Sequence, residues 1–126
     1  MVPTTTGAAE TVIEVLPKLK GLMTGLSVRV PVACGSLTDL TVEVLKKATV
    51  RSVNATLKRA ARTSMRGIIE YSEDELVSSD VINNPHSAVV DALSTQVDGN
   101  LVKVLAWYDN EYGYSQRVVD VLERLK

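Results

Sequence analysis

Two short stretches of this sequence carry residue types that bind anions. Thr6-Gly7 stands directly before apolar residues spaced at the period of a helix face. A helix start offers free backbone N–H groups and the positive end of the helix dipole, so Thr6-Gly7 is a candidate anion site. A plain helix cap, with a threonine at the cap position, is the alternative reading there. Arg29 lies in an alternating apolar run, where its guanidinium is either solvated or presents a fork that matches phosphate or carboxylate.

The third feature is the segment from Trp107 to Arg117. It holds the only tryptophan and three of the four tyrosines. An apolar run precedes this segment and an amphipathic pattern follows it, which predicts a turn from a buried strand into a helix. Turns at strand ends are common places for ligand sites. Packing of the aromatic side chains is the alternative interpretation.

Cys34 and His86 are the single cysteine and the single histidine of the chain. Cys34 follows a strand pattern and precedes a glycine, which would suit a nucleophile, but no histidine is near it in sequence and no neighbour favours its thiolate. His86 follows Asn83-Asn84-Pro85 in a predicted turn, where it could act as a general base, although a structural role is the simpler interpretation. One cysteine and one histidine do not make a dedicated zinc or iron site, so no metal is expected.

The composition narrows the class of protein further. The chain has 126 residues, 45% hydrophobic content, a net charge of −1 and a pI of about 5.8. This length suits one domain with a real core, and no basic excess points to nucleic acid. No apolar run is long enough for a membrane span, and the first residues do not read as a signal peptide. The expected location is therefore the cytoplasm.

The apolar periodicity predicts helices and strands in a mixed order. A helix begins after Thr6 and ends near Leu16, because Pro17 cannot continue it. A second helix follows Thr49, which we expect to cap it, and a final helix covers about 111–126. Strands are expected at 26–32, 40–44, 68–71, 76–82, 87–93 and 101–107, with a hairpin at Asp98-Gly99. This order predicts an α+β fold, a largely antiparallel or mixed sheet with helices packed on one face.

With these segments in place, the chain closely resembles the C-terminal catalytic domain of phosphorylating glyceraldehyde-3-phosphate dehydrogenase. Six segments carry the resemblance, in the order and spacing of that family: Pro3–Ala9, Val28–Pro31, Leu37–Val42, Leu76–Asp80, Pro85–Ser87 and Trp107–Ser115. The last of them, which reads Trp-Tyr-Asp-Asn-Glu-Tyr-Gly-Tyr-Ser, is the most specific. The resemblance covers essentially the whole chain.

The resemblance implies roles for five residues. Thr6 and Gly7 match the pair that binds phosphate at the helix start, and Arg29 matches the arginine that contacts substrate or inorganic phosphate. Asn110 matches the asparagine that hydrogen-bonds the nicotinamide carboxamide, and Tyr114 matches the tyrosine near that ring. The implied substrates are glyceraldehyde 3-phosphate and inorganic phosphate, the implied cofactor is NAD or NADP, and the implied assembly is a homotetramer.

The printed sequence lacks other parts of that family. It contains no Ser-Cys-Thr-Thr-Asn nucleophile motif, no matching base histidine and no Rossmann glycine pattern, so we assign no catalytic residue to it. We expect residues 1–126 to form a single partial catalytic domain whose last helix, about 111–126, packs on the absent Rossmann domain. The isolated chain is then expected to be inactive. The alternative is a non-catalytic module derived from the family, used for oligomerisation or for binding a phosphate ligand.

Overall fold

The computed structural model describes residues 1–125. The chain divides into two compact units, Met1–Ala33 and Cys34–Lys126, and each is described by itself below. No helix within residues 1–125 is both long and apolar enough to cross a membrane.

The first unit consists of two short strands and two short helical segments. Strand β1 (Val2–Thr4) pairs antiparallel with β2 (Ser27–Arg29), and helix α1 (Ala8–Val15) and the 3-10 turn η1 (Pro17–Leu19) lie between them in sequence. The helix ends just before Pro17, as predicted, because proline has no N–H for the helical ladder. Strand β2 is shorter than the predicted run 26–32, which also contains Pro31.

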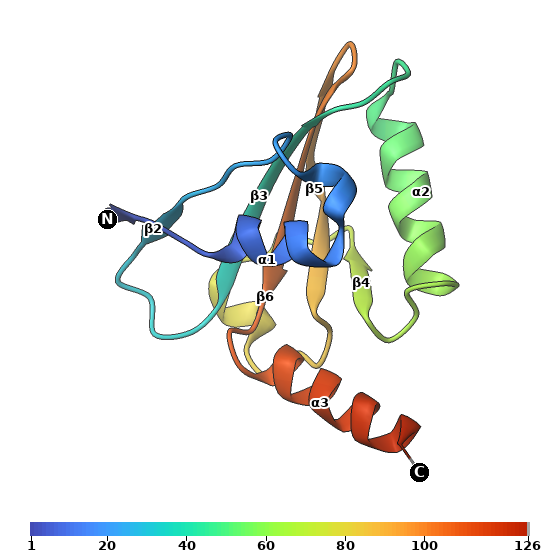
Figure 1. Ribbon diagram of the computed structural model, residues 1–126. Coiled ribbons are helices and arrows are strands. Elements are labelled where there is room, and N and C mark those ends of the chain that lie inside the picture. Colours follow the sequence, from blue (N-terminus) through green and yellow to red (C-terminus); the bar gives the residue numbers. More distant parts are fainter. Residues whose placement is uncertain (126) are drawn as a thin grey trace. The chain divides into compact units, whose positions relative to one another are not determined.

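The second unit is built on a four-stranded mixed sheet, drawn as arrows in Figure 1. Its order is β3 (Ser36–Glu43), β6 (Leu101–Tyr108), β5 (Ala88–Asp98) and β4 (Ile69–Ser72). The β3–β6 and β5–β6 pairs are antiparallel, and only β4 and β5 run parallel. These pairings confirm the predicted α+β class with a largely antiparallel, mixed sheet.

Helix α2 (Val50–Arg62) packs on β4 and β5. It begins where Thr49 was expected to cap it: the Thr49 hydroxyl accepts from the Ser52 N–H at 3.1 Å, and the Ser52 hydroxyl accepts from the Thr49 N–H at 3.0 Å. This reciprocal arrangement satisfies two donors at the helix start that have no partner in the helix itself. The buried apolar residues of the unit come mainly from the central strands: Val89, Val90, Ala92 and Val102, with Val81 from the 3-10 turn before β5.

The structure corrects one predicted strand. The segment 76–82 is not a strand but contains a short 3-10 turn, η2 (Ser78–Val81). The Asp80 carboxylate accepts a hydrogen bond from the Val77 N–H at 2.7 Å, and the Asp80 N–H donates to the Val77 carbonyl at 3.0 Å. These two local bonds hold the chain in a turn, so the apolar residues of the segment are not evidence of strand alternation.

The hairpin at Asp98-Gly99 is confirmed. Asp98 pairs with Leu101 across β5 and β6, and Gly99 has a φ of 63°. Glycine adopts this left-handed conformation without the steric cost that a side chain would bring. The two strands joined by this turn run to the opposite end of the sheet, where β6 ends at Tyr108.

Helix α3 (Tyr112–Arg124) follows the end of β6 and extends away from that end of the sheet (Figure 1). It confirms the predicted last helix, although residue 126 of the predicted range lies outside the described residues. One side of α3 is apolar and exposed: Val118, Val119, Val121, Leu122 and Leu125 are each between 42% and 78% exposed. An exposed apolar helix face of this extent is typical of a surface that another protein element covers.

Candidate functional site

The turn between β6 and α3 is organised by the carboxylate of Asp109. This side chain is 6% exposed, and it accepts four hydrogen bonds from groups far apart in sequence. Oδ1 accepts from the backbone N–H groups of Glu111 and Tyr112, both at 2.8 Å. Oδ2 accepts from the Asn83 N–H at 2.9 Å and from the Cys34 thiol at 3.4 Å. One carboxylate therefore ties together the start of α3, the loop before β5 and the segment before β3.

These donors determine the charge of Asp109. The N–H of Tyr112, followed by those of Glu111 and Asn83, lowers the pKa of the Asp109 carboxyl from 3.8 to about 2, although burial acts in the opposite direction. Hydrogen bonds to a charged acceptor favour its ionised form. The side chain is therefore a carboxylate at neutral pH, and as an acceptor only it matches the donors around it.

Asn110 lies next to this carboxylate and is exposed. Its Oδ1 accepts a hydrogen bond from the Ser36 hydroxyl, and Ser36 is paired with Tyr108 where β3 begins and β6 ends. The amide oxygen has a second lone pair, and the amide nitrogen carries two N–H groups. Asn110 is thus held from one side and can still accept from and donate to a ligand such as a carboxamide.

Gly113 and Tyr114 lie in the first turn of helix α3. Gly113 is buried, and a Cβ at its position would lie 2.6 Å from the backbone carbonyl oxygen of His86. Only glycine permits this close approach, so the first turn of α3 packs directly on the backbone of the His86 turn. Tyr114 is 74% exposed and lies in the same helical turn. The turn therefore presents an amide and an aromatic ring, from Asn110 and Tyr114, on rigid supports.

The two residues considered as nucleophile and base do not meet. Cys34 is half-buried and donates its thiol hydrogen bond to Asp109, which gives it a structural partner. The His86 Nδ1 atom lies 2.9 Å from the Asn84 Oδ1 atom and 3.3 Å from the Glu70 Oε2 atom. These contacts agree with the structural interpretation of both residues.

The Thr6-Gly7 turn leads into α1, in the first unit. Gly7, rather than a threonine, occupies the N-cap position, and the Thr6 hydroxyl accepts from the Ala8 N–H at 3.2 Å. The expectation of a threonine at the cap position was therefore wrong by one residue. The Thr6 hydroxyl hydrogen is free to point outward, and the first-turn N–H groups of a helix have no partner within it. This is a donor set for an anion, although the Glu10 carboxylate in the first turn of α1 opposes a second negative charge there.

Arg29 ends β2 and is exposed. In the antiparallel register it lies opposite Val2, whereas Thr4 lies opposite Ser27. Thr6 is four residues further along the chain than Val2, roughly 13 Å if extended. The strand pairing thus does not place Arg29 beside the Thr6-Gly7 turn.

Sequence reasoning assigned no role to Asp109 or Ser36, although Asp109 lies in one segment that carries the resemblance and Ser36 directly precedes another. One signal was available: Asp109 directly follows a strand and stands three residues before the first residue of a helix. Aspartate at such positions commonly accepts hydrogen bonds from N–H groups two and three residues later. The hydrogen bonds from Asn83 and Cys34 to Asp109, and from Ser36 to Asn110, join residues far apart in sequence. No local pattern predicts such contacts.

Comparison with known proteins gives a consistent result. Residues 1–110 match the family model described as glyceraldehyde 3-phosphate dehydrogenase, C-terminal domain. The chain is 54% identical over 126 residues to glyceraldehyde-3-phosphate dehydrogenase 2 of Bacillus subtilis, covering 99% of this chain and 37% of that protein. It is 57% identical over 122 residues to glyceraldehyde-3-phosphate dehydrogenase 1 of Bacillus cereus, covering 96% of this chain and 36% of that protein. The chain thus spans little more than a third of the length of these relatives.

The Asp109 arrangement predicts a specific effect of Asp109→Asn. The amide keeps the size of the side chain but removes the charge and one acceptor, so we expect a loss of on the order of 2 kcal/mol in the free energy of unfolding at pH 7. Denaturant unfolding measures this loss. Glu75→Gln, which removes one negative charge from an exposed side chain, is the matched control and is expected to change stability little.

The same variant is expected to change the pH dependence of stability. The folded pKa of about 2 lies below the unfolded value of 3.8, so the contribution of Asp109 is complete above about pH 4 and is lost as pH falls toward 2. The parent chain should therefore lose stability more steeply than Asp109→Asn across this window. If both proteins lost the same free energy of unfolding between about pH 4 and pH 2, the lowered pKa of Asp109 would be contradicted.

Proposed function

Because this chain belongs to the family of the glyceraldehyde 3-phosphate dehydrogenase C-terminal domain, we propose that it supplies the substrate-phosphate and nicotinamide contacts of an NAD(P)-dependent glyceraldehyde-3-phosphate dehydrogenase. The reaction would oxidise glyceraldehyde 3-phosphate and couple the oxidation to phosphorylation by inorganic phosphate. The observation that carries the proposal is the Asp109-centred turn, which fixes Asn110 and Tyr114 at an exposed strand end.

The nicotinamide side of the proposal rests on Asn110 and Tyr114. When bound, NAD(P) supplies the hydride acceptor, and this chain's part is to orient the nicotinamide ring. The Asn110 amide, held through its oxygen by Ser36, offers both a donor and an acceptor to a carboxamide. The exposed Tyr114 ring offers an apolar face from the first turn of α3. Orientation by fixed groups lowers the entropy cost of reaching the reactive geometry.

The phosphate side of the proposal rests on Thr6, Gly7 and Arg29. The start of α1 provides neutral N–H donors and a hydroxyl, whereas Arg29 provides a charged fork. Since the β1–β2 register does not bring these groups to one point, we propose that they serve two different phosphate groups, one from each substrate.

The nucleophile, the base and most of the cofactor site would come from outside the printed sequence, in a Rossmann-containing part. The exposed apolar side of α3 supports this, because a helix face of that kind needs a cover. We further propose that the complete protein is a cytoplasmic homotetramer.

A chimera tests the proposal directly. The 126 residues would replace the aligned segment of the Bacillus subtilis relative, of which they match 37%. We expect NADH formation from glyceraldehyde 3-phosphate by the chimera and none by the 126-residue chain alone. Within the chimera, Asn110→Ala should raise KM for the cofactor by about tenfold, the loss expected when one or two hydrogen bonds disappear.

Asn100→Ala is the matched control in the chimera, since Asn100 lies in the β5–β6 hairpin at the other end of the sheet. Its cofactor KM should stay within about twofold of the parent value. A folded chimera without activity would favour the non-catalytic module, and an unchanged KM in Asn110→Ala would refute the nicotinamide role.

Arg29→Ala tests the phosphate assignment in the same chimera. Loss of a guanidinium–phosphate contact should raise KM for one of the two phosphate-bearing substrates by at least about tenfold and leave the cofactor KM near its parent value. Steady-state kinetics with each substrate varied in turn measures this. Arg51→Ala, at an exposed position of α2, is the control, and unchanged KM values for both substrates in Arg29→Ala would overturn the role.

A further inference from the structure

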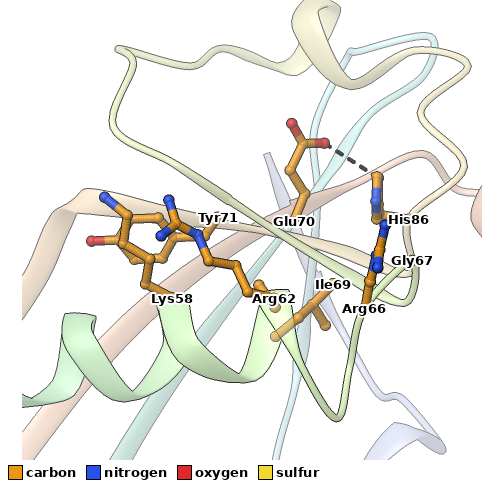
Figure 2. A pocket seen from close by; sticks show the side chains of 9 residues that line it. Lys58, Arg62, Arg66, Gly67, Ile69, Glu70, Tyr71 and His86 are labelled. Carbon is orange, nitrogen blue, oxygen red and sulfur yellow. Dashed lines mark ion pairs between the residues drawn. The ribbon is translucent and has the colours of Figure 1, made fainter.

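A cavity of the second unit lies between α2 and β4. It has a volume of about 390 Å³ and is lined by the last turns of α2, the loop that follows it, β4 and His86. All of these belong to the second unit. None of the residues assigned to the proposed dehydrogenase function lines this cavity, which is shown in Figure 2.

Three cationic side chains surround the cavity: Lys58, Arg62 and Arg66. Lys58 is already engaged, because its Nζ atom lies 2.9 Å from the Glu73 carboxylate and 5.1 Å from the centre of the Tyr71 ring. Within residues 1–125, neither Arg62 nor Arg66 has a carboxylate within ion-pair distance. Two guanidinium groups on one cavity therefore lack a counter-charge from the described part of the chain.

The single carboxylate in the lining, Glu70, is turned to other partners. It accepts from the Asn84 amide at 2.8 Å and lies 3.3 Å from the His86 Nδ1 atom. Figure 2 shows this carboxylate pointing toward His86, while Arg62 reaches toward Tyr71.

The backbone around the two arginines is fixed at both ends. Arg62 is the last residue of α2, and after Arg66 the Gly67 carbonyl accepts a hydrogen bond from the Arg117 guanidinium of α3 at 2.9 Å. Gly67 has a φ of 75°, which turns the chain sharply from α2 into β4. The backbone that carries the two arginines is therefore held by the fold.

We propose that this cavity binds a small free anion with two linked phosphate groups. Planar guanidinium groups form paired hydrogen bonds with phosphate oxygens, and two unpaired arginines match two phosphate groups. Lys58 adds a third positive charge at the rim. The proposal does not depend on dehydrogenase activity, since no residue is shared between the two sites.

The test is calorimetric titration of the 126-residue chain with inorganic pyrophosphate, with single inorganic phosphate and citrate as comparisons. We expect pyrophosphate to bind at least about tenfold more tightly than either comparison anion, because only pyrophosphate carries two phosphate groups, one for each arginine. In Arg62→Ala/Arg66→Ala, its Kd should rise by at least about tenfold. Both side chains are exposed, so the variant should fold, and circular dichroism checks this.

The matched control is Arg51→Ala/Arg59→Ala, which removes the same charge from the same helix at exposed positions outside the cavity lining. Its Kd for pyrophosphate should stay within about threefold of the parent value. Equal weakening in both double variants would show general attraction to a basic surface and would overturn the proposal. Citrate binding as tight as pyrophosphate, or no binding of pyrophosphate at all, would overturn it as well.

Discussion

The constraint on which the turn between β6 and α3 depends is the buried carboxylate of Asp109. A buried charge is costly unless hydrogen bonds replace the water it loses, and here three backbone N–H groups and one thiol do so. Each donor comes from a segment whose position then becomes fixed. The end of β6, the start of α3 and the loop at Asn83 are thereby held in one arrangement, and Asn110 has its place because its neighbour is anchored.

Several features of the fold follow from local sequence signals. Pro17 ends α1, Thr49 caps α2 and Asp98-Gly99 makes the hairpin, because each acts through the backbone within a few residues. The prediction of a strand at 76–82 was wrong, because it relied on the apolar residues of the segment and gave no weight to Asp80. The Asp80 side chain accepts from the Val77 N–H and holds the segment in a turn. The bonds to Asp109 join residues 26 and 75 positions away, and no local pattern reports such contacts.

The candidate site residues came from resemblance rather than from periodicity. On residue types alone, Thr6-Gly7 was a cap or an anion site, and the aromatic segment was packing or a ligand turn. The structure adds that Asn110 and Tyr114 are exposed while Asp109 and Gly113 beside them are buried. This alternation separates the residues that are available to a ligand from those that hold the turn. It also gives Cys34 a structural partner in place of a chemical role.

In the folded chain, Asp109 is ionised and held by backbone donors. The most direct measurement of this is an NMR titration of the Asp109 side-chain carboxyl carbon, with the amide protons of Glu111, Tyr112 and Asn83 followed in the same spectra. We expect a midpoint near pH 2 that all three amides share. A carboxyl that titrates near pH 4, or amides that do not respond to its titration, would show that these donors do not hold an ionised Asp109.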